Sequence, residues 1–307
     1  MGQSGDGWKG VFVVSVTPFD EQGDLDETAF ASLMDTFVGD GVDGVVVAGS
    51  TGEWYTLHDD ERLRLFEIAR ARLPPHVTLI AGTAAIATRD AVALTAAAQG
   101  RGCDGAMVLA PPYAQPSQRE LFAHFREVAA VGLPLMVYNN PGRTQVNMPA
   151  DVLEQLCEND SVVALKESSK DLYQIAETTC RLKDRLAVFS GLEPYALPTL
   201  QRGAVGIVSM GTNILGRQAI DLYTHFAGGR WQQAHEVEAR LDRLYDAFYA
   251  GGYGAYVVIK ECMRLMGRPA GWPRRPHLRP DEVGVRALAN MLREIGAELP
   301  ESTTTHA

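Results

Sequence analysis

Short runs of consecutive apolar residues recur along this chain and alternate with longer stretches in which apolar and polar positions follow a helical period. Successive runs start 19 to 34 residues apart. The eight runs lie at residues 11–16, 45–48, 77–81, 106–109, 135–138, 162–165, 187–189 and 206–209. Uninterrupted apolar runs of this length are typical of strands buried on both faces, as in parallel sheets. We therefore predict eight parallel strands.

The stretches between these runs have the apolar spacing of amphipathic helices. They cover residues 27–38, 61–72, 90–99, 120–131, 151–157, 172–182 and 194–201. Parallel strands need a crossover connection, which is usually a helix. Eight such units fit a closed barrel better than an open doubly wound sheet. The predicted fold class is α/β, a (β/α)8 TIM barrel.

Further helical patterns follow the eighth run. They lie at residues 218–226, 232–248, 256–266 and 282–295. We interpret the first as the helix that closes the barrel and the others as a C-terminal helical extension. The predicted organisation is a barrel over residues 8–226 that carries the active site, an extension over 227–299 and a polar tail over 300–307.

The amino-acid composition narrows the classes of binding partner that we expect. The 307 residues include 38 acidic and 28 basic side chains, a formal net charge of −10. This balance disfavours a polyanion-binding surface, so we expect no nucleic-acid partner. No apolar run approaches the roughly 18 residues that a membrane helix needs, and the chain start lacks the apolar core of a signal peptide. We expect a cytoplasmic protein with no membrane partner.

Cysteine and histidine positions do not suggest a metal centre. The four cysteines lie far apart without a Cys-x-x-Cys pair, and the seven histidines have no metal-ligand spacing. We therefore expect reduced thiols and no metal site.

Lys166 directly follows the sixth apolar run and is one of only five lysines in the chain. Strand alternation places it on the same face as Val162 and Ala164. If that face points into the barrel, burial favours the neutral amine, which can attack a carbonyl and form a Schiff base. The alternative is a lysine paired with a carboxylate at the strand end. The neighbouring strand ends favour the catalytic interpretation.

Tyr138 ends the preceding strand at the matching position. A buried phenol there can relay protons while an imine forms and is hydrolysed. Tyr113 and the hydroxyl of Ser50 or Thr51 can complete this relay. The alternative is that the tyrosines only pack at the barrel rim.

Two parts of the sequence are suited to bind the carboxylate groups of a substrate. Ser50-Thr51-Gly52 follows the second strand and offers hydroxyls and backbone donors to a small anion, although Ser50 alone could be a helix cap. Glu53 is expected to tie down this loop. Arg143 follows Tyr138 by five residues and can clamp a second carboxylate. The alternative interpretation is that Arg143 is an arginine on a solvated surface loop.

One basic stretch receives a structural interpretation only. Residues 268–276 read RPAGWPRRP and carry three arginines among three prolines. Because the stretch is short and rich in turn residues, we expect an exposed turn.

Six sequence motifs together resemble one known family. They are VTPFD (16–20), GSTGE (49–53), PPYAQPSQ (111–118), YNNPGRT (138–144), LKESS (165–169) and SGLE (190–193). Their order and spacing over residues 8–215 resemble the dihydrodipicolinate synthase and N-acetylneuraminate lyase family of class I aldolases.

The resemblance implies a barrel with a C-terminal helical extension, usually assembled as a homotetramer, a dimer of dimers. It implies that Lys166 forms the imine, that Tyr138 is the acid/base phenol, and that Ser50 and Thr51 bind the pyruvate carboxylate. Tyr113 would join the proton relay across a subunit interface. No cofactor is expected beyond the covalent imine on Lys166. We also predict substrate contacts for Gly52, Gly191 and Val208.

The sequence identifies the second substrate less narrowly than the first. Arg143 matches the arginine that dihydrodipicolinate synthases use on aspartate semialdehyde, which favours condensation of pyruvate with that aldehyde, as in 4-hydroxy-tetrahydrodipicolinate synthase. Three positions depart from the synthase pattern, namely Gln145, Leu192 and the segment 253–260. The alternatives are an aldolase or dehydratase of a 2-keto-3-deoxy sugar acid, a related deaminase, or a non-catalytic keto-acid sensor.

Overall fold

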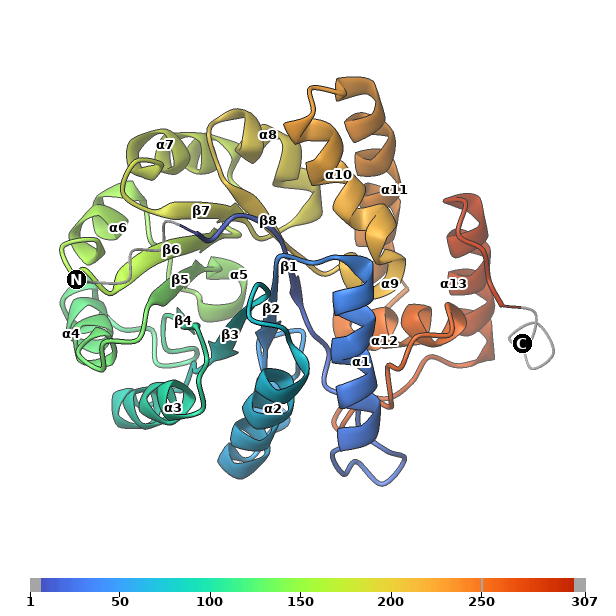
Figure 1. Ribbon diagram of the computed structural model, residues 1–307, viewed down its shortest axis with the longest axis horizontal. Coiled ribbons are helices and arrows are strands. Elements are labelled where there is room, and N and C mark those ends of the chain that lie inside the picture. Colours follow the sequence, from blue (N-terminus) through green and yellow to red (C-terminus); the bar gives the residue numbers. More distant parts are fainter. Residues whose placement is uncertain (1–6, 250, 301–307) are drawn as a thin grey trace.

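Eight parallel strands form a closed barrel in which each strand pairs with its neighbour in the sequence (Figure 1). The computed structural model describes residues 7–249 and 251–300. The strands are β1 (Gly10–Val14), β2 (Gly44–Val47), β3 (Thr78–Gly82), β4 (Gly105–Leu109), β5 (Leu135–Asn139), β6 (Val162–Glu167), β7 (Ala187–Ser190) and β8 (Gly206–Ser209). Pairing of β1 with β8 closes the barrel. The predicted fold class is confirmed.

Helices between the strands surround the barrel (Figure 1). They are α1 (Glu27–Asp40), α2 (Asp59–Arg72), α3 (Thr88–Gly100), α4 (Gln118–Ala129), α6 (Ala150–Leu156), α7 (Leu172–Leu182), α8 (Ala196–Gln201) and α10 (Arg217–Ala227). Local signals set their ends. Asp26 caps α1 by accepting from Ala29 N, Gly41 ends it at φ 87°, and Ser117 with Glu120 forms a capping box at α4. Such caps satisfy backbone groups that the helix itself leaves free.

Four short helical turns follow strands. They are η1 (Trp54–Thr56), α5 (Pro141–Thr144), η2 (Glu193–Tyr195) and α9 (Thr212–Leu215). The turn η2 overlaps the start of the helix predicted over residues 194–201, and the other three were not predicted. Segments of three or four residues are too short to show a helical period, so the apolar pattern misses them. Strand β6 also continues to Glu167, two residues beyond the predicted end at Leu165. Both differences lie at the carboxyl ends of strands, where the site is built.

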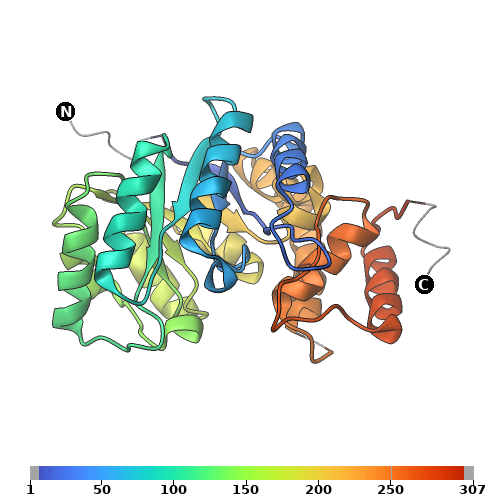
Figure 2. The same ribbon diagram turned by 90° about the horizontal axis from the view of Figure 1, so that it is seen from below.

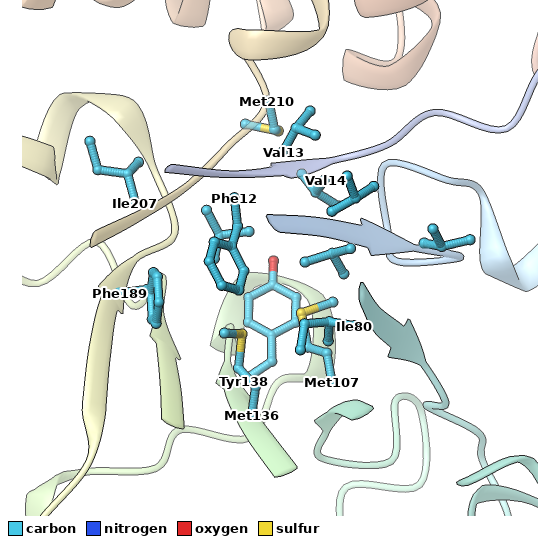
Figure 3. Close-up of a cluster of buried hydrophobic side chains, with 14 of the residues drawn as sticks. Phe12, Val13, Val14, Ile80, Met107, Met136, Tyr138, Phe189, Ile207 and Met210 are labelled. Atoms are coloured by element: carbon cyan, nitrogen blue, oxygen red, sulfur yellow. The ribbon is translucent and has the colours of Figure 1, made fainter. Parts of the chain in front are cut away.

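The barrel interior is filled by aromatic and aliphatic side chains. The rings of Phe12 and Phe189 lie 4.9 Å apart, and glycines make room for them. A Cβ on Gly44 would lie 2.8 Å from the Phe12 ring, and one on Gly206 would lie 2.6 Å from the Phe189 ring. Figure 3 shows Tyr138 in the same cluster. The interior is therefore a packed core that becomes polar only toward the strand ends.

The C-terminal helices α11 (Trp231–Tyr249), α12 (Ala255–Leu265) and α13 (Glu282–Glu294) pack together on one side of the barrel (Figure 2). Helix α12 is the most deeply buried of the three, since its residues from Ala255 to Met263 are all buried. No helix in the described part of the chain is long and apolar enough to cross a membrane. Most of the predicted polar tail, residues 301–307, lies outside the described residues.

The expectation of an exposed turn over residues 268–276 is wrong in part. Arg274 lies largely buried, pairs with Glu61 at 2.6 Å, and stacks 4.0 Å above the ring of Phe19. Trp272 forms a backbone bridge with Phe19. The basic stretch therefore connects the C-terminal extension to the barrel through contacts with Glu61 and Phe19. Its composition could not reveal this, because the partners are distant in sequence.

Candidate active site

Strands β5 and β6 place Tyr138 and Lys166 side by side inside the carboxyl-end mouth of the barrel. The two residues are direct partners in the β5–β6 ladder, so their side chains lie on the same face. The Lys166 amine is 4.4 Å from the centre of the Tyr138 ring. Only 3% of Lys166 and 4% of Tyr138 is exposed. The structure thus brings together an amine and a phenol.

The Lys166 amine forms no hydrogen bond or ion pair with any residue that the structure describes. Its neighbour Glu167 faces the other side of the strand, where Asn139 donates to its carboxylate at 3.1 Å and Ser169 N donates at 2.7 Å. Burial raises the pKa of Glu167. This carboxylate is therefore engaged elsewhere, and the alternative of a strand-end ion pair for Lys166 does not hold in this structure.

Gly191 at the end of β7 leaves the space that the lysine side chain occupies. A Cβ at this position would lie 2.9 Å from both Cγ and Cε of Lys166, and it would collide with Oγ of Ser168. No side chain larger than hydrogen fits without displacing the lysine. Gly191 thus lies against the Lys166 side chain, and its contact with a substrate stays a prediction.

Ser168 is a polar group of this site that the sequence predictions did not include. It lies two residues after Lys166 and therefore on the same side of the chain. Its hydroxyl is buried and has no hydrogen-bond partner in the described part of the protein. The signal was present in the strand alternation, but β6 was predicted to end at Leu165, which hid it.

The loop after β2 presents Ser50, Thr51 and Gly52 at the same end of the barrel. Thr51 and Gly52 are buried and Ser50 is partly exposed. The hydroxyl of Thr17 donates to the carbonyl of Gly52 at 2.7 Å. Ser50 caps no helix, because the turn η1 starts after Glu53 and α2 starts after His58. The helix-cap alternative for Ser50 is therefore excluded.

Glu53 ties this loop down, as expected. Its backbone adopts φ 54°, in the left-handed region, and its side chain is buried. The carboxylate pairs with Lys260 of α12 at 2.5 Å and accepts a hydrogen bond from Arg274 N at 3.2 Å. The loop is therefore anchored to the C-terminal extension.

The segment after β5 carries two further groups to the mouth. The amide of Asn140 donates to the Tyr138 hydroxyl at 2.7 Å. Arg143, on the short helix α5, places its guanidinium carbon 4.9 Å from the centre of the Tyr256 ring on α12. Arg143 is exposed and has no carboxylate partner among the described residues. Its fork is free to bind an anion from solution.

Two further predicted site residues differ in their exposure. Tyr113 is 92% exposed in a turn with φ 69°, and the single chain does not bring it to Lys166. Val208 is fully buried on β8, on the interior-facing side that it shares with Gly206. Among the described residues, no group of three or more histidine, cysteine or acidic side chains is arranged to hold a metal ion.

The fold and this geometry define a class of protein, a (β/α)8 barrel whose mouth holds a buried, unpaired amine beside a phenol. The family model described as "Dihydrodipicolinate synthetase family" matches residues 7–295. The chain belongs to this family, whose members are lyases.

Curated relatives and solved structures agree with that assignment. The chain is 42% identical to an "Uncharacterized DapA-like lyase" of Rhizobium meliloti, over 94% of this chain and 96% of the relative. It is 33% identical to a 4-hydroxy-tetrahydrodipicolinate synthase of Oceanobacillus iheyensis, over 92% and 96%. The crystal structure of dihydrodipicolinate synthase from Aquifex aeolicus matches with a TM-score of 0.89 at 32% identity, over 95% and 99% of the two chains. YagE from E. coli K12, solved in complex with pyruvate, matches with a TM-score of 0.90 at 25% identity, over 94% and 98%.

Proposed function

We propose that this lyase forms a Schiff base between Lys166 and pyruvate or a related 2-oxo acid. The observation that carries the proposal is the buried Lys166 amine, which has the Tyr138 phenol beside it and no anionic partner in the described residues. An amine that no anion engages is open to approach by the carbonyl carbon of a bound ligand. The similarity to YagE, whose structure contains pyruvate, supports the choice of ligand.

The chemistry needs only the chain's own groups. The Lys166 amine attacks the ketone carbon of the 2-oxo acid, and Tyr138 donates a proton to the hydroxyl that leaves as water. The resulting iminium withdraws electrons, so a proton leaves the adjacent carbon and an enamine forms. The enamine carbon then attacks an aldehyde, whose oxygen takes up a proton. Water finally hydrolyses the imine and releases the amine, and no separate cofactor takes part.

Each remaining predicted residue has a proposed place in this scheme. Ser50, Thr51 and Gly52 bind the carboxylate of the 2-oxo acid, while Gly191 and Val208 shape the pocket around its carbon chain. Tyr113 enters the proton relay of a neighbouring subunit in a homotetramer. The near-complete exposure of this phenol in a left-handed turn supports such a role, since the turn holds the ring away from its own chain.

Aspartate semialdehyde is the proposed second substrate. Arg143 supports this choice, because its exposed guanidinium has no carboxylate partner among the described residues and can bind the aldehyde's carboxylate in a bidentate manner. Relatives about one third identical are named 4-hydroxy-tetrahydrodipicolinate synthase. The reaction then joins C3 of pyruvate to the aldehyde carbon.

A substrate panel tests this proposal. Pyruvate with aspartate semialdehyde is compared with a series of 2-keto-3-deoxy sugar acids, using wild type and Arg143→Ala. We expect turnover of the first pair, and a loss of about 10- to 100-fold in kcat/KM for aspartate semialdehyde in the variant, the value of a charged hydrogen-bonded pair. Faster turnover of a sugar acid, or equal activity of the variant, would replace the proposed substrate. Thermal stabilisation by keto acids without any turnover would indicate a sensor.

A further inference from the structure

Helix α12 of the C-terminal extension directs two neighbouring side chains toward the mouth of the barrel. Tyr256 and Lys260 are four residues apart and therefore lie on the same face of the helix. Both are buried, with 6% of Tyr256 and 2% of Lys260 exposed. Each contacts a different loop, and those two loops carry the proposed binding groups for the two substrate carboxylates.

Lys260 holds the loop that contains Ser50, Thr51 and Gly52. Its amine lies 2.5 Å from Glu53, the residue directly after Gly52, and donates to the carbonyl of Trp272 at 2.8 Å. Burial lowers the pKa of Lys260 to about 8, and Glu53 counteracts this shift. A buried pair with such short contacts has little freedom to move, so it fixes where the loop's hydroxyls and N–H groups point.

Tyr256 holds Arg143. The guanidinium carbon lies 4.9 Å from the ring centre, in cation–π range. Arg143 is otherwise a long, exposed side chain without a carboxylate partner in the described residues. Stacking on a buried ring restricts its rotamers before a ligand arrives, which lowers the entropy cost of binding. Burial also raises the pKa of the Tyr256 phenol, so the ring remains uncharged beside the cation.

We propose that α12 is a positioning element that sets both carboxylate sites at once, Lys260 through Glu53 for the 2-oxo acid and Tyr256 through Arg143 for the second substrate. This inference rests on the proposed function. It assigns the extension a direct part in substrate binding, with one α12 residue for each carboxylate site.

The first arm of the proposal, that Tyr256 positions Arg143, is tested by a pair of variants. Tyr256→Leu removes the ring, and we expect KM for aspartate semialdehyde to rise about three- to tenfold, the value of a partly buried cation–π contact. The KM for pyruvate and kcat should change little. Tyr256→Phe keeps the ring and should restore most of the lost affinity. Equal effects of Tyr256→Leu on both KM values, or no rescue by phenylalanine, would overturn this arm.

The second arm of the proposal, that Lys260 positions the loop through Glu53, is tested by trapping the pyruvate imine with borohydride. The mass of the intact chain is measured at increasing pyruvate concentrations. The double variant Glu53→Gln/Lys260→Met removes both charges and leaves neither buried alone. We expect the pyruvate concentration for half-maximal trapping to rise about tenfold, with an unchanged end point of one label per chain. If the double variant does not fold, Glu53→Asp, which keeps the charge but shortens its reach, carries the same test. An unchanged half-maximal concentration in the folded variant would overturn this arm.

Arg264→Ala is the matched control at the C-terminal end of the same helix, where the exposed Arg264 pairs with Glu261, which Arg279 also holds at 2.9 Å. It should leave both readouts at wild-type values, and a shift in either would mean that any change in α12 perturbs the site. Failure of wild type to be trapped by pyruvate would refute the proposed function itself. Trapping of wild type with unshifted variants would refute only the positioning role of α12.

Discussion

Two buried lysines occupy nearly the same local sequence and have opposite surroundings. Lys166 follows VVAL and precedes Glu167, and Lys260 follows YVVI and precedes Glu261. Both are almost fully buried. Lys260 has a carboxylate at 2.5 Å and a carbonyl at 2.8 Å. Lys166 has only the face of an aromatic ring at 4.4 Å among the described residues. The contrast shows that the spatial partner, and not the local sequence, distinguishes a paired buried lysine from an unpaired one.

The physical reason for the contrast is the cost of burying a charge. A buried ammonium is tolerated when an anion and hydrogen-bond acceptors surround it, as at Lys260. Lys166 has neither an anion nor a hydrogen-bond acceptor beside its amine among the described residues, and its proposed role is addition to a carbonyl. The fold supplies the first environment at a helix within the extension and the second at the end of a barrel strand.

Replacing Lys166, the proposed Schiff-base lysine, should have the largest effect on turnover. In Lys166→Met the nucleophile is lost, and we expect kcat to fall by about 10⁴-fold or more. Stability should be unchanged or higher, because an unpaired buried amine is replaced by an apolar chain of similar length. Steady-state kinetics and urea unfolding measure the two quantities. Loss of several kcal/mol of stability in this variant would contradict an unpaired amine.

The matching substitution at the structural lysine should reverse that outcome. Lys260→Met leaves the Glu53 carboxylate buried without its cation, and we expect a loss of about 3–5 kcal/mol in the free energy of unfolding. Urea unfolding of Lys260→Met and Lys166→Met under identical conditions gives the comparison directly. Equal free energies of unfolding of the two variants would mean that the Lys260–Glu53 ion pair stabilises the fold no more than an apolar side chain does.

Removing the phenol beside Lys166 should act on chemistry alone. Tyr138→Phe keeps the ring that faces the Lys166 amine but loses the hydroxyl that accepts from Asn140. We expect kcat to fall by about 10²–10⁴-fold, the usual contribution of general acid–base catalysis. The pyruvate imine should still form, at a lower rate. Normal turnover of this variant would remove Tyr138 from the proton relay.

A buried histidine extends the comparison to a third basic group. His124 is buried, contacts the Thr88 hydroxyl at 3.0 Å, and burial lowers its pKa to about 4. Between that value and the ordinary pKa near 6.5 the unfolded chain binds more protons, so stability falls as pH falls through this window. The loss due to this residue should reach about 3 kcal/mol at pH 4. His124→Gln should have a shallower pH dependence of unfolding between pH 6.5 and 4 than wild type, and parallel curves would contradict a neutral His124.

The barrel could be predicted because its signals are local. Each strand is a short apolar run, each outer helix has a full helical period, and the strict alternation of the two permits few topologies. The same alternation correctly placed Lys166 on the face that it shares with Ala164. It was wrong for Val162, because a register shift between the partners of Leu135 and Met136 turns Val162 to the other face. What it could not show is the partner of each polar group. That information is spread over the whole chain.

The parts that escaped prediction depend on distant contacts. Arg274 pairs with Glu61, 213 residues away, so the stretch around it is held in place and not an exposed turn. The partnership of Lys260 with Glu53 likewise joins the extension to the second strand's loop. Ser168 was missed for a different reason, because polar residues at a strand end interrupt the apolar run that marks the strand.

Borohydride reduction in the presence of pyruvate, followed by peptide mass mapping, tests the central contrast most directly. The account predicts that the reduced adduct forms on the peptide that contains Lys166, and that the peptide containing Lys260 remains unmodified at saturating pyruvate. In Lys166→Met no adduct should form anywhere in the chain. An adduct on Lys260, or full activity with Lys166 unlabelled, would contradict the assignment of the two lysines.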